Sequence, residues 1–233
     1  MTTLLAFETA TEACSVALWL DGEVRERHGT APRQHTALAL PWADELLAEA
    51  GLAKSQLDGI AVGRGPGAFT GVRLAIALAQ GVALALDRPV LPVSTLAALA
   101  MQAEGKDGEA ILAIIDARMG EFYVGEFVCD ADGLVAAVSE ERLLSSEAVA
   151  IDPSKSWRGV GSGFAAADGI LRQRLAAGLT CCDPAALPHA GAVARLAARA
   201  YARGEAIAAD RLEPAYLRDK VALTIKEQRD ARR

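Results

Sequence analysis

A glycine-rich segment, residues 63–71, carries the clearest chemical signal in the sequence. It follows an apolar run and precedes a helical pattern, and backbone N–H groups at the start of a helix can bind a phosphate. A Walker loop would need Gly-Lys-Ser/Thr at the helix start, where this chain has Gly71, Val72 and Arg73, and the glycines do not fit the spacing of a dinucleotide site. The segment is either an anion-binding loop or a tight turn between a strand and a helix, and the spacing favours the turn.

A second candidate site lies directly after the first apolar run, at Glu8, Thr9 and Thr11. Some ATPases and kinases carry an Asp-x-Gly-Thr phosphate loop at such a place, where the short acid holds a metal and the glycine lets the backbone approach a phosphate. Here the acid is one methylene longer and Ala10 adds a Cβ, so we expect a vestigial nucleotide loop. Glu8 and Asp116 are either a carboxylate pair across a cleft or solvated loop acids, and the sequence favours the second interpretation.

Other catalytic and metal-binding patterns are missing from the sequence. Its three histidines, His28, His35 and His189, form no pair at helical spacing, and its four cysteines have no Cys-x-x-Cys spacing. An esterase elbow is also missing, because the serine within residues 159–163 stands one place late. The sequence therefore predicts no metal site and no catalytic residue.

The composition restricts the class of protein. The chain has 233 residues, of which 52% are hydrophobic and 23% are charged, and its formal net charge is −6. This hydrophobic content supports a packed core, whereas the negative charge argues against binding nucleic acid or a membrane surface by the protein's own field. The cysteine pattern is typical of reduced residues, and the N-terminus lacks the basic region of a signal peptide. We expect a cytoplasmic protein.

The elements that would position the candidate residues begin with three strands of a meander, at residues 4–7, 14–20 and 23–30. A helix, a strand, a second helix, a strand and a third helix follow. The expected bounds of these five elements are 33–50, 59–63, 70–86 with Thr70 as the N-cap, 89–93, and 94 or 95 to 103.

The strand pattern begins again after a linker at residues 104–108. An apolar run ends in Asp116 as the first one ends in Glu8, and a second Asp-Gly turn follows at nearly the same interval. This indicates a duplicated β-β-β-α-β-α unit, with a coincidence of common hairpin signals as the alternative. The predicted fold is α/β, an actin-like, duplicated ribonuclease-H-like architecture of two mixed sheets flanked by helices. Its halves are expected at 1–104 and 109–233, the second of them eroded.

The helix predicted at residues 71–86 is apolar on nearly all faces, with Arg73 and Gln80 as its polar side chains. It is shorter than the roughly 20 residues of a membrane span. One face must pack on a sheet, and the other is covered either by the preceding helix alone or by a second protein chain. For the second case, the predicted interface residues are Leu38, Trp42, Leu46, Arg73, Leu74, Ala77, Leu78 and Gly81. The charged residues 226–233 are expected to form a solvated tail.

Together these segments resemble the bacterial TsaB (YeaZ) family over nearly the whole chain. The matching stretches are residues 5–18, 34–35, 40–41, 65–73, 93–96, 116–118, 121–123 and 214–218. The resemblance implies an actin-like, non-catalytic scaffold that is required to form N6-threonylcarbamoyladenosine (t6A) at position 37 of tRNAs reading ANN codons. The implied partners are the catalytic subunit TsaD and the ATPase TsaE.

The resemblance also implies how the chain assembles. TsaD holds its metal with a histidine pair on the helix after the glycine-loop helix, and residues 94–99 of this chain contain neither histidine. The implied states are a homodimer in isolation and a heterodimer with TsaD through the first two helices. tRNA would bind only within the complex, and ATP or ADP only at a partner interface. Glu8 and Gln80 depart from the Asp and Lys common in the family, which argues further against a small ligand. An actin-fold small-molecule kinase or a TsaD-like metallopeptidase is the alternative.

Overall fold

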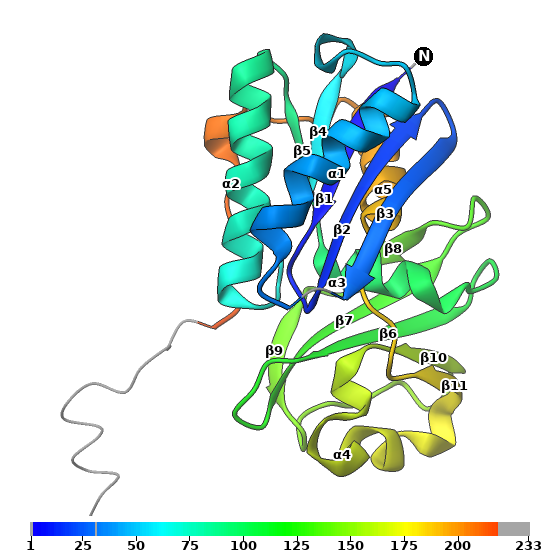
Figure 1. The fold of residues 1–233 in the computed structure, drawn as a ribbon. Coiled ribbons are helices and arrows are strands. Elements are labelled where there is room, and N and C mark those ends of the chain that lie inside the picture. Colours follow the sequence, from blue (N-terminus) through cyan, green and yellow to red (C-terminus); the bar gives the residue numbers. More distant parts are fainter. Residues whose placement is uncertain (1, 31, 219–233) are drawn as a thin grey trace, which may run out of the picture.

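The computed structural model describes residues 2–30 and 32–218 (Figure 1), so the tail predicted at 226–233 lies outside the described residues. Its first sheet has five strands in the order β3-β2-β1-β4-β5. β1, β2 and β3 are antiparallel, and β4 and β5 run parallel to β1. The strands are β1 (Thr3–Glu8), β2 (Ala13–Leu20), β3 (Glu23–Thr30), β4 (Gly59–Gly63) and β5 (Val90–Val93).

The second sheet repeats this arrangement. Its order is β11-β10-β6-β7-β8, and β9 pairs with β7. β6, β7 and β8 are antiparallel, and β10 and β11 run parallel to β6. In both sheets the first strand is central. The other two strands of an antiparallel meander lie on one side of it, and two parallel strands lie on the other side. The predicted duplicated ribonuclease-H-like fold is therefore confirmed. The strands are β6 (Ala110–Asp116), β7 (Glu121–Cys129), β8 (Val135–Ala137), β9 (Arg142–Ser145), β10 (Trp157–Val160) and β11 (Leu179–Asp183).

Helices cover both faces of the first sheet (Figure 1). α1 (His35–Glu49) and α2 (Phe69–Leu86) lie on one face, and α5 (Ala190–Ala202) lies on the other. Successive side chains of a strand point to opposite faces. In β1, Leu5 and Phe7 accordingly pack in the cluster that includes α1 and α2, whereas Leu4 and Ala6 pack in the cluster with α5.

Two further helices cover the second sheet. α3 (Thr95–Ala100) joins the cluster with α5, and α4 (Ala166–Arg174) packs on the other face of the second sheet. Of the two caps predicted for α3, Ser94 and Thr95, Ser94 is the N-cap, because its Oγ accepts the Ala97 N–H at 3.0 Å. The prediction that Thr70 caps α2 is wrong. The N-cap is Ala68, because its N–H donates to the Ala10 carbonyl at 2.7 Å and so fixes the turn one residue before the helix.

The last described segment returns to the first sheet. Ile207 pairs with Val90 at the free edge of β5, and the Gln80 side-chain amide on α2 donates to the carbonyls of Ala209 (3.0 Å) and Leu212 (3.3 Å). The two sheets separate near the expected boundary of about 104–110, whereas α5 and this segment belong by sequence to the second half and pack on the first sheet. The division into two sequence halves therefore stays a prediction.

Candidate functional site

The glycine-rich segment packs directly on the loop that follows β1. A Cβ added to Gly71 would lie 2.0 Å from the Thr9 carbonyl oxygen, and one added to Gly67 would lie 2.5 Å from the Ala10 carbonyl oxygen. Thr9 also donates its hydroxyl to the Gly71 carbonyl at 2.7 Å. The glycines therefore allow two backbone segments to touch, and the chain itself fills the space beside the loop. This supports the tight-turn interpretation of residues 63–71.

Glu8 lies at the centre of this junction and is only 1% exposed. Its Oε1 accepts the Ala10 N–H at 2.7 Å, and its Oε2 accepts the Thr95 hydroxyl at 2.9 Å. The carboxylate occupies the place of a side chain at Gly63, where an added Cβ would lie 1.9 Å from Oε2. Burial raises the pKa of Glu8 to about 7, although these hydrogen bonds oppose the shift.

The expectation of solvated loop acids is therefore wrong for Glu8. The carboxyl turns into the core, because Gly63 and Thr95 provide a space and a hydrogen-bond donor there. Asp116, at the equivalent end of β6, pairs instead with the neighbouring Arg118 at 2.9 Å. Thr11, the third residue of the predicted nucleotide loop, accepts the Ala13 N–H at 3.4 Å. Each residue of the predicted loop thus bonds to groups of this chain.

Two glycines of α2 provide a matched test of this packing. We expect Gly71→Ala to lower the free energy of unfolding by about 3 kcal/mol, because its Cβ overlaps a backbone oxygen that cannot move aside. Gly81→Ala should instead raise it by about 0.5–1 kcal/mol, because a Cβ there meets nothing within 4 Å and alanine favours a helix. Urea denaturation of dilute protein measures both values. Equal effects of the two substitutions would contradict the proposed close contact at Gly71.

The outward face of α2 is mostly apolar, and no other described segment buries it. The buried face packs in the core of the first sheet, while Leu74 and Leu78 are half-buried. Among the described helices, α2 alone has the length and hydropathy to cross a membrane, with a mean hydropathy of 1.7, yet only 33% of it is buried. The exposed residues of α2 are Phe69, Thr70, Arg73, Ala77, Gly81, Leu84 and Ala85. We call these seven residues the outer face of α2.

α1 contributes less to this surface than the sequence predicted. Leu38 and Trp42 are half-buried against the core, and Leu40 is 45% exposed. Leu46 is fully buried and is wrong as an interface residue. The cause is the helical period, because Leu46 shares the inward side of α1 with Ala39 and Ala43.

An aromatic group extends the outer face of α2 at its N-terminal end. The Arg73 guanidinium lies 3.3 Å from the centre of the Phe69 ring and 5.1 Å from that of Tyr216. Both rings are largely exposed, at 64% and 56%. Tyr216 belongs to the returning segment, so its place beside Arg73 could not be inferred from local spacing. Exposed aromatic and arginine side chains are the types that contribute most to protein interfaces.

A cluster that was not predicted from the sequence joins β3 to α5. Glu26, His28 and His189 offer ligand atoms within 4.8 Å of one another. The two imidazole rings are stacked, with centroids 3.8 Å apart and planes at 7°. Burial and the nearby His189 lower the pKa of His28, whereas Glu26 opposes the shift. The Glu-x-His spacing on one face of a strand was a usable signal, but His189 is distant in sequence and enters only through the fold.

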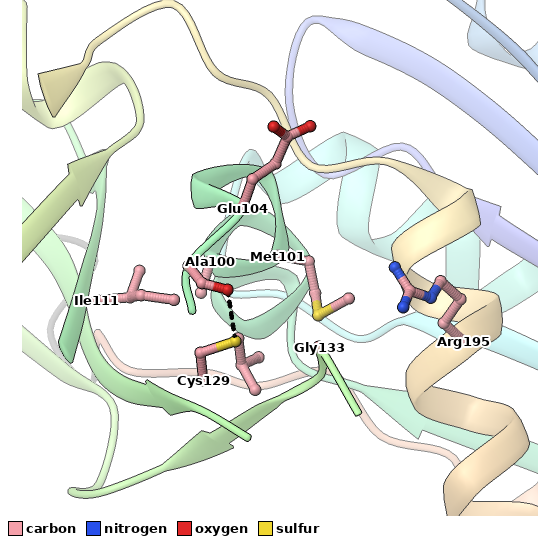
Figure 2. A pocket seen from close by; sticks show the side chains of 9 residues that line it. Ala100, Met101, Glu104, Ile111, Cys129, Gly133 and Arg195 are labelled. Carbon is pink, nitrogen blue, oxygen red and sulfur yellow. Dashed lines mark hydrogen bonds between the residues drawn. The ribbon is translucent and has the colours of Figure 1, made fainter. Parts of the chain in front are cut away.

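A small pocket of about 260 Å³ lies apart from these residues (Figure 2). Met101 lies on one side of it, and Arg195 extends toward it from α5. At its base the Cys129 thiol donates to the Gly105 carbonyl at 2.9 Å, and burial raises the pKa of that thiol. The lining contains none of the predicted site residues, so the pocket does not belong to the candidate site.

Comparison with known proteins identifies the family. The model of the family described as TsaD, tRNA N6-adenosine threonylcarbamoyltransferase, matches residues 25–226. A protein of Escherichia coli (strain K12), named tRNA threonylcarbamoyladenosine biosynthesis protein TsaB, is 40% identical over 224 residues, which cover 94% of this chain and 96% of the relative. The chain belongs to the TsaB family. The TsaB protein of Haemophilus influenzae is 39% identical over 229 residues and is covered to 94%, as is this chain.

A solved structure of the same family supports the fold. YeaZ from Pseudomonas aeruginosa superimposes with a TM-score of 0.82 at 43% identity, over 93% of this chain and 100% of that one. The two chains therefore share the fold over most of their length. The resemblance inferred from the sequence is confirmed.

Proposed function

We propose that this chain is a non-catalytic subunit that helps to form t6A at position 37 of tRNAs reading ANN codons, by binding the catalytic subunit TsaD. Support for the pathway comes from the TsaB relatives, which are named for tRNA threonylcarbamoyladenosine biosynthesis. The match to the TsaD family model makes a related protein of the same fold the natural partner. TsaE is the further subunit that we expect in the complex.

The observation that carries this proposal is the outer face of α2. Five of its seven residues, all except Thr70 and Arg73, are apolar, and Phe69 and Leu84 are 64% and 68% exposed. Large exposed apolar side chains grouped on one helix face are typical of protein interaction sites. Ala77 and Gly81 are small residues at its centre, so the backbone of a facing helix can approach closely. Phe69, Arg73 and Leu84 surround them with larger groups. This arrangement suits a helix-to-helix contact.

The same face would serve both proposed states of assembly. In the absence of TsaD, a second copy of the chain would cover it, which gives the proposed homodimer. TsaD would displace that copy, because both partners need the outer face of α2. The homodimer and the heterodimer would therefore exclude each other, and the balance between them would depend on the concentration of each chain.

The junction around Glu8 supports the proposed lack of catalysis. The predicted nucleotide loop is filled by this chain's own backbone, with Gly67 and Gly71 in contact with Ala10 and Thr9. A nucleotide would therefore bind only at an interface to which a partner contributes. The net charge of −6 similarly leaves most of the phosphate contacts of tRNA to the partners. We propose that the chain acts in the cytoplasm, where tRNA is modified.

Assays with the isolated chain and the complete set of enzymes test this proposal. Alone, the chain should neither hydrolyse ATP nor modify tRNA. With TsaD, TsaE and the enzyme that makes threonylcarbamoyl-AMP, it should be required for t6A formation, measured by mass spectrometry of tRNA nucleosides. Full modification without the chain would refute the scaffold role. ATP hydrolysis by the isolated chain would instead favour the small-molecule kinase alternative.

A further inference from the structure

The cluster of Glu26, His28 and His189 lies on the side of β3 that faces α5. Side chains alternate along this strand, so Arg25 and Arg27 point to α1, where Arg27 pairs with Glu49. Glu26 and His28 take the opposite face, and Glu26 Oε2 lies 3.3 Å from His189 Nδ1 at the start of α5. We propose that these three side chains form a binding site for a divalent transition metal ion of the zinc class.

The donor set fits such an ion. Two imidazoles and one carboxylate are the ligands of open zinc sites, in which water occupies the fourth position. Hard ions such as magnesium and calcium prefer oxygen ligands only, which makes them poor occupants. The ligand atoms already lie within 4.8 Å of one another. All three residues are partly exposed, so an ion could reach them from solvent.

The surroundings of Glu26 hold its carboxylate in place. Its Oε1 accepts hydrogen bonds from the Ser15 hydroxyl and from the Gly191 N–H, the latter at 3.1 Å. Ser15 is oriented in turn, because its oxygen accepts the Ala190 N–H at 2.9 Å. Protein ligands to metals are commonly fixed by such outer hydrogen bonds, and Oε2 remains directed at the histidines.

Binding requires a small rearrangement of the rings. Nitrogen lone pairs lie in the plane of each imidazole, so two parallel rings do not direct them at one point. A rotation of His28 about its Cβ–Cγ bond would make them converge, and this side chain is exposed on an edge strand. The bound ion would tie β3 to the start of α5 and so join the first sheet to a late segment of the chain.

Zinc titration of the tag-free chain tests the site. After treatment with a chelator, the wild-type protein should bind one Zn²⁺ per chain by calorimetry. His28→Gln, His189→Gln and Glu26→Gln should each weaken binding by at least about tenfold. His35→Gln is the matched control, because His35 lies elsewhere with Nε2 at 3.2 Å from the Ala13 carbonyl, and it should bind as the wild type does. Circular dichroism establishes that each variant is folded.

A cysteine control separates this site from binding to thiols. Cys181 is exposed and Cys182 is half-buried, and thiolates also bind zinc. The double variant Cys181→Ser, Cys182→Ser should retain the site, and Co²⁺ should give a spectrum without the intense thiolate charge-transfer band. The proposal is overturned if the cysteine variant loses the ion or if folded His28→Gln and His189→Gln bind it unchanged. Failure of the wild type to bind Zn²⁺ would also overturn the proposal, and the three residues would then form only a hydrogen-bonded and stacked contact between β3 and α5.

Discussion

Ala77→Glu should abolish the binding of TsaD while the chain stays folded. Ala77 is exposed at the centre of the outer face of α2, and glutamate is a good helix former, so the isolated chain has no reason to unfold. At a dry helix-to-helix contact the same carboxylate would be buried without a partner. Such burial costs several kcal/mol, and about 3 kcal/mol already corresponds to a loss of affinity of more than about 100-fold. Calorimetry with TsaD and analytical ultracentrifugation measure the loss for the heterodimer and the homodimer.

Ala202→Glu is the matched control for this substitution. Ala202 is also an exposed helical alanine, but it ends α5 on the opposite face of the first sheet. This variant should bind TsaD with wild-type affinity. Leu74→Glu and Leu78→Glu are less informative, because both side chains are half-buried and a charge there would also destabilise the fold. If folded Ala77→Glu binds TsaD as tightly as the control does, the interface lies elsewhere.

The stability of the chain should depend on the ionisation of Glu8. In the folded protein its pKa is raised to about 7 from the ordinary value of 4.5, so the folded state favours the neutral carboxyl. The stabilising effect of this proton is complete below about pH 4.5 and is lost as the pH rises to about 7. The loss amounts to about 3 kcal/mol in the free energy of unfolding.

Comparison with Glu8→Gln isolates this contribution from those of other groups. Glutamine keeps the shape of the neutral carboxyl and has no charge, so the variant should lose little stability between about pH 5 and pH 8. Urea denaturation of both proteins at these two pH values gives the difference. If the stabilities of the wild type and the variant change in parallel with pH, Glu8 does not titrate in this range and its pKa is not raised to about 7.

The fold was largely predictable because its signals are local. Strand alternation, the Asp-Gly turns and the repeat of an acid after each first strand are each visible within a short window, and they indicate the duplicated topology. The apolar character of α2 was equally visible. The side of α2 that faces outward could not be predicted, because it depends on how the helix packs on the sheet, and this packing leaves Ala77 and Gly81 exposed.

The candidate site was less predictable because it joins distant segments. Glu8 is buried through its contacts with Gly63 and Thr95, and a charged residue after a strand otherwise suggests a solvated loop. Tyr216 reaches Arg73 because the last described segment returns to the first sheet, and His189 reaches Glu26 because α5 packs on that sheet. No local period or motif indicates these three contacts.

The yield of t6A in a reconstituted reaction containing Ala77→Glu tests whether TsaD must bind the outer face of α2. The other enzymes, the tRNA, threonine, bicarbonate and ATP are held constant, and the chain is supplied as wild type, Ala77→Glu or Ala202→Glu. Docking of TsaD on the outer face of α2 predicts full modification with the wild type and with Ala202→Glu, and the background level of a reaction without the chain with Ala77→Glu. Full modification with folded Ala77→Glu would contradict the claim.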